Sequence, residues 1–468
     1  MAKAIIDRTE ERTGPEQPAH DAFFNALRAE NYSRLDKEKH VYLDYTGGNL
    51  YAASQLEEHF KLLRDNTFGN PHSTNPTSQL ASELVENSRK KVIDFFNAED
   101  YVCIFTYNAT GALKIIGECY PFEEDGHLLL LADNHNSVNG IREYCSNAGG
   151  TFEYSPINVE ELTIAEDTLS SNLQSINNKN KLFAFPAQSN VSGIKHDLGW
   201  ISKAKSMGWD VLLDAAAFVP TSPLDLKKHS PDFVSVSFYK IFGYPTGLGC
   251  LLVHKNSFDK LKKRWFAGGT VKLASALAPY HFLQNNHERF ENGTINYLDI
   301  PALKIGLEYI ESIGMKRINE RVESMMRYLH NNLKNLKHSS GYNQVRIFGH
   351  PDRENMGGTM IMSFQNPDRS KIEFEKIEEL ANKQNISLRS GCFCNPGLDE
   401  INNCLTNEEL TKYFESRTSG DYRDMINSIH RLRGATRISV GIPTVKNDLD
   451  VLIQFVKNLK DKHIDNKA

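Results

Sequence analysis

Residues 231–254 read PDFVSVSFYKIFGYPTGLGCLLVH, two apolar runs joined by a turn rich in glycine and proline. The first run, residues 233–237, predicts a buried strand that brings Tyr239 and Lys240 to its carboxyl end, and residues 248–254 predict another strand. A lysine beside apolar neighbours at the end of a rigid strand can have a depressed pKa and react as a free amine with an aldehyde. An isolated lysine is more often a solvated surface side chain, so the functional interpretation of Lys240 depends on the rest of the chain.

Further apolar runs alternate with helix-like segments on the N-terminal side of this stretch. They lie at residues 102–106, 127–132, 181–186 and 209–214. This alternation predicts a mostly parallel sheet with helices on both faces and a ligand at the carboxyl ends of the strands. The pattern therefore indicates an α/β protein.

After Pro301 the pattern changes to apolar residues at steps of three and four, which predicts amphipathic helices broken near Gly314. Strand-like runs and a last helix follow, at residues 344–348, 359–364, 436–440 and 449–459. We therefore expect three parts, a flexible arm at residues 1–20, a large domain at 21–300 and a smaller α+β domain at 301–468. The N-terminal segment of the large domain is expected to pack with the small domain.

The composition is that of a soluble globular chain of 468 residues, 40% of them hydrophobic and 24% charged. A net charge of −5, with lysines scattered among acidic residues, offers no basic face to nucleic acid. No apolar run reaches the roughly 18 residues that a membrane helix needs, and the polar N-terminus resembles no signal peptide, so we expect a cytoplasmic protein. Seven cysteines, an odd number, suit reduced thiols better than a disulfide framework.

Asp214 ends one of the predicted strands, in the segment WDVLLDAAAF. A carboxylate there, followed by small residues that let a flat ring approach, can pair with a protonated pyridine nitrogen. The alternative is an aspartate that caps the next helix. The position of Asp214 shortly before Lys240 favours the functional interpretation.

Two other segments follow predicted strands. In TYNATGALK, residues 106–114, exposed amides and the Thr110 hydroxyl at a helix start form an anion site, as a cofactor phosphate would require, although plain N-capping explains Thr110 equally well. In ADNHNSVNG, residues 132–140, the His135 imidazole can lie against an aromatic ring, and a loop histidine without a special role is the alternative.

Taken in order, the motifs resemble those of fold-type I pyridoxal-5′-phosphate (PLP) enzymes of the class V aminotransferase and cysteine desulfurase superfamily. Within it, the chain is most similar to the amino-terminal, desulfurase-like domain of molybdenum cofactor sulfurases. The resemblance covers nearly all of residues 40–460. It runs through YLDYTGG at Tyr42, NPHST at Asn70, NATGALK at Asn108, DNHNSV at Asp133, LLDAAAF at Leu212, SFYKIFGYPTGLG at Ser237, FENGTINYLDIPAL at Phe290, LRSGCFCNPG at Leu388 and TRISVGIPT at Thr436.

The resemblance implies a large domain with a mostly parallel sheet of the seven-stranded type, PLP as cofactor and a role for each matching residue. Lys240 matches the lysine that carries the cofactor, Asp214 the partner of the pyridine nitrogen, and His135 the imidazole stacked on the ring. The remaining matches to cofactor-binding positions are Ala109, Thr110 and Ser237, as phosphate ligands, and Tyr239, which stands where many desulfurases place a histidine beside the lysine.

Substrate binding and assembly are implied in the same way. Asn190 and Arg437 match groups that hold the α-carboxylate of a small amino-acid substrate, a task that suits the planar fork of an arginine. Without the resemblance, a salt bridge to an acidic residue would be the preferred interpretation of Arg437. Thr294 matches a threonine that reaches the phosphate bound by the neighbouring subunit, which implies a homodimer with shared sites.

The cysteine pair in RSGCFCNPG lies among small residues, a glycine and a proline, which predicts a flexible loop whose thiol can swing toward a substrate sulfur. Related desulfurases accept sulfur as a persulfide on a loop cysteine, and the register of the resemblance places Cys394 there. Cys392 can assist or be silent. No second cysteine pair or histidine pair accompanies them, so we expect no zinc or other metal.

The resemblance therefore implies a cysteine desulfurase-like enzyme that converts L-cysteine to L-alanine and leaves a persulfide on Cys394. The alternatives are a PLP-dependent β-lyase or aminotransferase and, in a different class, a non-catalytic sulfur carrier or scaffold. Two departures leave the sulfur acceptor open. Sulfurase-type chains usually carry a third cysteine where this chain has Leu398 and Asp399, with Cys404 further on, and the chain ends shortly after the desulfurase-like region.

Overall fold

The protein is described from a computed structural model, in which residues 20–466 are described with the exception of 72, 124, 350–354 and 431. The flexible arm expected at residues 1–20 therefore lies, apart from His20, outside the described residues. Among the described residues, no helix is long and apolar enough to cross a membrane.

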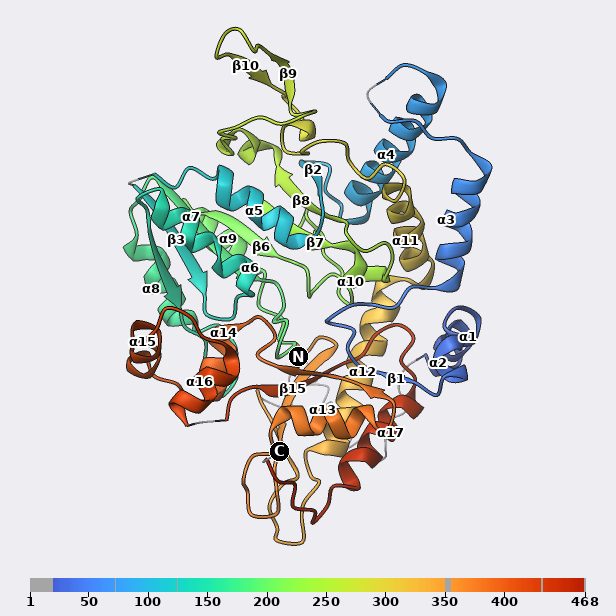
Figure 1. The fold of residues 1–468 in the computed structure, drawn as a ribbon, viewed down its shortest axis with the longest axis vertical. Helices are drawn as coiled ribbons and strands as arrows, with labels where there is room; N and C mark the ends of the chain where they lie inside the picture. The colour runs from blue at the N-terminus through green and yellow to red at the C-terminus, as the bar shows by residue number, and fades with distance from the viewer. Residues whose placement is uncertain (1–19, 72, 124, 350–354, 431, 467–468) are drawn as a thin grey trace, which may run out of the picture.

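A seven-stranded sheet forms the centre of the molecule (Figure 1), with the strand order β2-β8-β7-β6-β5-β3-β4. The strands from β7 to β4 run parallel, whereas β8 is antiparallel to both of its neighbours. The expected mostly parallel sheet is confirmed. The strands are β2 (Tyr101–Thr106), β3 (Gly126–Leu131), β4 (Thr151–Ser155), β5 (Asn180–Pro186), β6 (Asp210–Asp214), β7 (Phe233–Ser237) and β8 (Gly249–His254).

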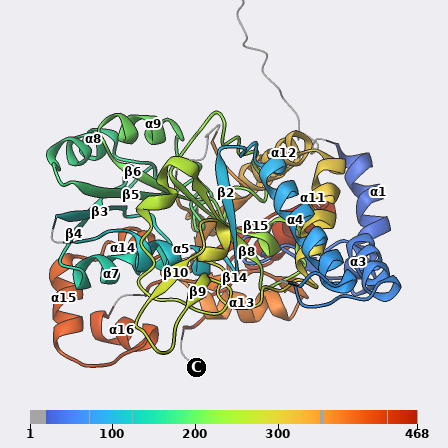
Figure 2. The same ribbon diagram turned by 90° about the horizontal axis from the view of Figure 1, so that it is seen from above.

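Both faces of this sheet are buried because successive side chains of its strands enter different hydrophobic clusters. Leu128 and Leu130 of β3 pack in a cluster with α5 and α7, whereas Leu129 and Leu131 pack in the cluster that contains α8 and α9. Figure 2 shows the two pairs of helices on opposite sides of the sheet. The helices before and around the sheet are α3 (Ala53–Asp65), α4 (Pro76–Phe95), α5 (Ala109–Cys119), α6 (Asn136–Asn139), α7 (Ile141–Asn147), α8 (Glu166–Ser175) and α9 (Gly199–Ser206).

A second, four-stranded antiparallel sheet has the order β11-β12-β15-β14. Its strands are β11 (Val345–Ile347), β12 (Thr359–Phe364), β14 (Arg389–Gly391) and β15 (Ala435–Ser439). The chain reaches it through α11 (Ile300–Ile313) and α12 (Met315–Leu333), which are separated at Gly314 as the sequence predicts. The other helices of this part are α13 (Phe374–Asn382), α14 (Pro396–Asn402), α15 (Asn407–Glu415), α16 (Tyr422–Ile429) and α17 (Lys446–Lys457).

The N-terminal segment joins this second part. It contains α1 (Asp21–Asn31), α2 (Ser33–Lys37) and β1 (Val41–Tyr42), and β1 pairs in parallel with β13 (Ile386–Ser387). The buried Arg28 of α1 forms an ion pair with the buried Asp448 of α17 and donates a hydrogen bond of 2.9 Å to the Pro443 carbonyl oxygen. Segments from the two ends of the chain are thereby held together.

Three elements differ from the expectation. β4 was not expected, because its residues TFEYS form no continuous apolar run and are polar or exposed at the edge of the sheet. The apolar run before Lys240 ends as a strand at Ser237 and continues as the short helix α10 (Phe238–Phe242). The strands β14 and β15 pair with each other although three helices, α14 to α16, lie between them in the sequence. A pattern of neighbouring residues therefore could not predict this pairing.

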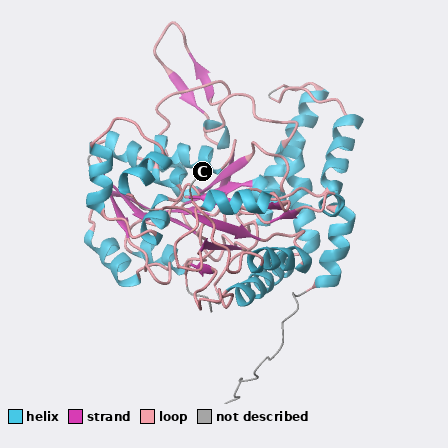
Figure 3. Ribbon diagram, turned by 60° about the horizontal axis from the view of Figure 1, so that its bottom comes forward, coloured by secondary structure: helices cyan, strands magenta, loops and turns pink. Residues whose placement is uncertain are grey.

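A two-stranded hairpin projects from the body of the molecule, as Figures 1 and 3 show. It consists of β9 (Val271–Ala274) and β10 (His281–Leu283) and lies between the short 3₁₀ helices η1 (Lys255–Lys260) and η2 (His287–Arg289). Its exposed apolar side chains are Leu273, Leu277, Tyr280 and Phe282.

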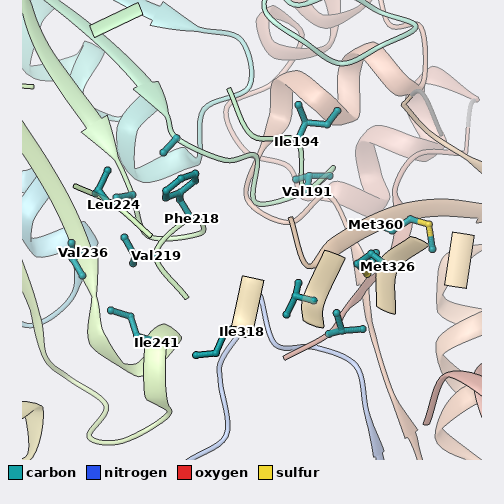
Figure 4. Close-up of a cluster of buried hydrophobic side chains, with 14 of the residues drawn as sticks. Val191, Ile194, Phe218, Val219, Leu224, Val236, Ile241, Ile318, Met326 and Met360 are labelled. Carbon is teal, nitrogen blue, oxygen red and sulfur yellow. The ribbon is translucent and has the colours of Figure 1, made fainter. Parts of the chain in front are cut away.

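One hydrophobic core extends from the large sheet into the second part of the chain. Figure 4 shows Val236 and Ile241 in the same cluster as Met326 and Met360, which come from α12 and β12. Helix α11 packs closely on α10 at one point of this core: a Cβ atom added at Gly306 would lie 2.3 Å from the ring of the buried Phe242.

This close approach predicts that Gly306→Ala destabilises the protein by about 1–3 kcal/mol, because the Phe242 ring has no free space into which to move. Thermal unfolding followed by circular dichroism measures the change in Tm. Gly268→Ala is the matched control, since a Cβ atom there meets no atom within 4 Å. Equal Tm values for both variants would contradict the close packing of α10 and α11.

Candidate active site

A cavity of about 130 Å³ lies where β3, β5, β6 and β7 end at the same edge of the sheet. Eight of the residues predicted from the sequence line it: Ala109, Thr110, His135, Asn190, Asp214, Ser237, Tyr239 and Lys240. The other lining residues are Asn108, Leu113, Ser137, Pro186, Gln188, Ala216 and Ala217. The cavity thus collects segments that are far apart in the sequence.

Lys240 lies in the single turn of α10, directly after β7. Burial lowers the pKa of its amine, and the positive charge of Arg437 acts in the same direction, whereas the negative charge of Asp214 opposes the shift. A lowered pKa increases the fraction of the free amine, which is the nucleophilic form.

Asp214 is a buried carboxylate at the end of β6. Its Oδ1 atom accepts hydrogen bonds from the Ser235 hydroxyl at 2.9 Å and from the Ala216 backbone N–H at 3.1 Å. Among the described residues, no donor is hydrogen-bonded to Oδ2, so it can accept a hydrogen bond from a protonated ring nitrogen. The small side chains of Ala216 and Ala217 follow at the cavity wall.

His135 lies at the start of α6 and has its ring orientation fixed by the backbone. Its Nδ1 atom accepts a hydrogen bond of 3.1 Å from the Ser137 N–H. Burial, together with the positive charges of Lys240 and Arg437, lowers the pKa of His135, and Asp214 opposes this shift. The imidazole is therefore neutral at pH 7, with its proton on Nε2, and is suited to lie against a flat aromatic ring.

The start of α5 has the features of an anion site. Asn108, and not Thr110, caps this helix, because its Oδ1 accepts a hydrogen bond of 2.9 Å from the Gly111 N–H. The Thr110 hydroxyl is thereby available at the cavity, 2.8 Å from the Ser137 hydroxyl, and the Ala109 N–H donates to the Ser237 hydroxyl at 2.8 Å. Hydroxyl groups and a helix N-terminus at one place favour the binding of a phosphate.

Arg437 is buried next to Asn190 and forms the salt bridge that was the alternative interpretation of this residue. Its Nη1 donates to the Asn190 carbonyl oxygen at 2.8 Å and its Nη2 donates to Asp44 at 2.8 Å. The Nε atom is buried and has no hydrogen-bond partner among the described residues. Arg437 thus has N–H groups, including that of Nε, which neither Asn190 nor Asp44 uses.

The loop that carries Cys394 is less free than the sequence predicts. The Asn136 N–H donates to the Cys394 carbonyl oxygen at 2.7 Å, and the Asn190 side chain donates to the Phe393 carbonyl oxygen at 2.8 Å. The buried Asn395 donates to Asp133 at 2.7 Å and to the Asn190 side chain at 3.1 Å. The backbone is therefore fixed on both sides of the thiol, while the Cys394 side chain remains exposed.

The two cysteines of this loop have different surroundings. Cys392 is partly buried, and burial raises its pKa, which disfavours the reactive thiolate. Phe393 and Cys394 both adopt left-handed backbone conformations, with φ values of 58° and 54°, so the hydrogen bonds of the loop maintain an uncommon chain path.

Three of the predicted residues are not among those that line the cavity: Cys394 and Arg437, which are hydrogen-bonded to Asn136 and Asn190 beside it, and Thr294. Thr294 is exposed, and its hydroxyl accepts a hydrogen bond of 3.5 Å from the Asn70 side chain. Sequence reasoning also missed Gln188, which lines the cavity shortly after β5 and has a buried Oε1 atom without a partner among the described residues. Its position after a predicted strand was the signal that could have identified it.

The chain belongs to the class V aminotransferase family, since the model of that family, described as "Aminotransferase class-V", matches residues 41–452. It is 37% identical to the molybdenum cofactor sulfurase of Homo sapiens over 456 residues and 35% identical to that of Arabidopsis thaliana over 475 residues. Each alignment covers 92% of this chain but only 50% and 57% of the relative. The chain thus spans about half the length of the curated relatives it matches.

Solved structures share the fold. A cysteine desulfurase from Thermococcus onnurineus NA1 aligns with a TM-score of 0.76 at 22% identity and covers 93% of this chain and 97% of its own. The cysteine desulfurase CsdA from Escherichia coli aligns with a TM-score of 0.73 at 21% identity, with coverage of 93% and 98%. These comparisons confirm the expected fold class.

The cofactor of this family is PLP, and the residues at the cavity fit it. Lys240 supplies an amine for the aldehyde, Asp214 an acceptor for the pyridine nitrogen, and the start of α5 a phosphate site. The buried and unpaired Oε1 of Gln188 marks a side-chain amide that a polar group of a bound molecule would satisfy. Among the described residues, no group of three or more His, Cys, Asp or Glu side chains could hold a metal ion.

The fixed loop predicts that Asn395→Ala increases the alkylation rate of Cys394 by iodoacetamide by roughly tenfold, the factor that corresponds to about 1.4 kcal/mol of lost hydrogen bonding. Mass spectrometry of peptides measures the rate at each cysteine. Cys404, which is exposed and outside the loop, provides the internal control. Unchanged alkylation of Cys394 in a folded variant would show that these bonds do not restrain the thiol.

Proposed function

We propose that the chain is a PLP-dependent cysteine desulfurase that converts L-cysteine to L-alanine and leaves the sulfur as a persulfide on Cys394. The observation that supports this proposal is that Lys240 and Asp214 line one cavity together with Asn190, whose side chain binds the carbonyl oxygen of Phe393, the residue before Cys394. A transaminase or a β-lyase needs the amine and the carboxylate but has no need of a thiol held at the same place.

In the proposed reaction, Arg437 and Asn190 hold the substrate α-carboxylate, so that the substrate sulfur lies toward the loop of Cys394. Bound PLP supplies an electron sink for negative charge at the substrate α-carbon. Lys240, as a free amine, removes the α-proton and returns a proton to the substrate. Asp214, a buried carboxylate, balances the positive charge of the ring nitrogen, and the neutral His135 covers the ring.

The sulfur transfer balances without an added oxidant or reductant. The Cys394 thiolate attacks the substrate sulfur, the carbon–sulfur bond breaks, and the substrate β-carbon takes up a proton. One thiol and L-cysteine thereby give one persulfide and L-alanine. An acceptor then takes the terminal sulfur, and the names of the relatives make the molybdenum cofactor the first acceptor to test.

Two further parts of the proposal concern assembly and location. The exposed Thr294 reaches the phosphate of a second subunit in a homodimer, and the apolar side chains on the projecting β9–β10 hairpin support burial against a partner. The buried cysteines Cys103, Cys119, Cys145 and Cys250 are thiols and form no disulfide, which supports a reducing, cytoplasmic location.

The cofactor proposal predicts that the purified protein absorbs in the visible range and that Lys240→Ala loses the wild-type band, because that band requires the lysine amine. Absorption spectra after addition of PLP and gel filtration measure this. Lys114→Ala, a change of an exposed lysine on α5, should keep the band. A colourless wild type that does not take up added PLP would contradict the proposal.

The sulfur-transfer proposal predicts that Cys394→Ala abolishes persulfide formation, while the spectral change on addition of L-cysteine remains, because the thiol acts only after the substrate has bound. Cys392→Ala is the matched control and should have a smaller effect, since its thiol is partly buried. Mass spectrometry locates the added sulfur, and L-alanine is measured in parallel. Sulfide and pyruvate as products, unaffected by either change, would favour the β-lyase.

The assembly proposal predicts a dimer in light scattering at working concentration. Leu277→Asp places a charge on a fully exposed apolar side chain of the hairpin and should shift the equilibrium toward the monomer. Full activity of a monomeric wild type would contradict shared sites.

A further inference from the structure

Two arginines from neighbouring strands share one carboxylate at the edge of the candidate site. Arg389 of β14 and Arg437 of β15 are direct cross-strand partners. The Arg389 Nε and Nη2 atoms lie 2.8 and 2.7 Å from Asp44 Oδ2, and the Arg437 Nη2 lies 2.8 Å from Asp44 Oδ1. Two positive charges directly opposite each other would repel, and Asp44 removes that repulsion.

The cluster is built into the fold. Asp44 belongs to the N-terminal segment, where it follows β1, and pairs with Ser439 of β15 through an isolated bridge. A Cβ atom at Gly47 would lie within 2.8 Å of both Asp44 carboxylate oxygens and of the Arg389 guanidinium, so a glycine is needed at this position. The side chain of Asp44 is 12% exposed, that of Arg437 4% and that of Arg389 52%.

The cluster faces the reacting groups. Arg437 contacts the carbonyl oxygen of Asn190, which lines the cavity. The Arg437 guanidinium also lies 5.0 Å from the ring centroid of Phe393, the residue before Cys394. Burial lowers the pKa of Lys240, and the positive charges of both arginines act in the same direction, in agreement with this position beside the cavity. The Arg437 Nε atom is buried without a partner among the described residues, so neither Asp44 nor Asn190 uses all the donors of this guanidinium.

The three side chains carry two positive charges and one negative charge, which leaves a single net positive charge next to the cavity. We propose that Asp44 is a specificity-determining residue that limits this site to amino acids with one carboxylate and an uncharged side chain. Asp44 binds the guanidinium of Arg389, so within this cluster of described residues no cation is left to balance the second negative charge of a dicarboxylic amino acid. This inference rests on the proposed function, in which Arg437 holds the substrate α-carboxylate.

The test compares L-asparagine with L-aspartate, which have nearly the same size and differ in side-chain charge. Binding to the PLP-loaded protein is measured from the change in visible absorption during titration, and neither ligand has a sulfur to transfer. Wild type should prefer L-asparagine. Asp44→Asn raises the net charge to +2 and should shift the ratio of the two Kd values toward L-aspartate by about tenfold, whereas Arg389→Gln, with a net charge of 0, should shift it the other way.

The double variant, Asp44→Asn with Arg389→Gln, restores a net charge of +1 and should return the ratio close to that of wild type. If the cluster had a purely structural role, the double variant would bind both ligands more weakly than either single variant, and the ratio of the two Kd values would not return to that of wild type. This result would overturn the proposal. An unchanged ratio in both single variants would overturn it as well. If Asp44→Asn does not fold, Arg389→Gln remains as a test, because it changes a half-exposed side chain. The direction in which it shifts the ratio of the two Kd values then decides.

Failure of the proposed function has a different signature. If the wild type gives no L-alanine or persulfide from L-cysteine, the desulfurase proposal fails, and the ratio of the Kd values for L-asparagine and L-aspartate is still measured. If L-cysteine is converted but the ratio does not follow the charge of the cluster, the role of Asp44 alone is rejected.

Discussion

The hydrogen bond from the Ser235 hydroxyl to Asp214, 2.9 Å across β6 and β7, connects the register of the sheet to the chemistry of the site. In this register Asp214 lies opposite Ser235, and Lys240 follows only five residues later on α10. A shift of β7 by one residue would exchange the faces of all its side chains, so Val234 and Val236 would leave their cluster and Lys240 would leave the cavity. The packing of both faces therefore also fixes the positions of the reacting groups.

Much of this arrangement could be predicted because the central strands are apolar runs. Buried parallel strands have to be apolar on both faces, and polar residues that follow such runs lie at one edge of the sheet. This argument leads to Asp214, His135 and Lys240 from the residues alone. Asn190 and Arg437 required the resemblance, because an arginine in a strand indicates a salt bridge as readily as a substrate.

Other features could not be predicted because they depend on contacts between distant segments. Asp44 and Arg389 are 345 positions apart and meet only because β1 and its following loop join the second sheet. The hydrogen bonds that fix the loop of Cys394 involve Asn136, Asn190 and Asp133. Nothing in the sequence around these three residues indicates that they bind this loop. A local pattern of glycine and proline predicts flexibility, and tertiary hydrogen bonds override it.

The fixed loop also has a consequence for how this chain can change in length. Arg389 is bound to Asp44 at one end and Asn395 to Asp133 at the other, so the path of residues 390–394 is closed at both ends. An inserted or deleted residue there would move the thiol and leave buried amides without acceptors. Further along the same connection to β15, α15 and α16 are largely exposed and can absorb insertions, whereas α14 has no exposed residue. Variation in length among related chains should therefore be found after Asn395 and not before it.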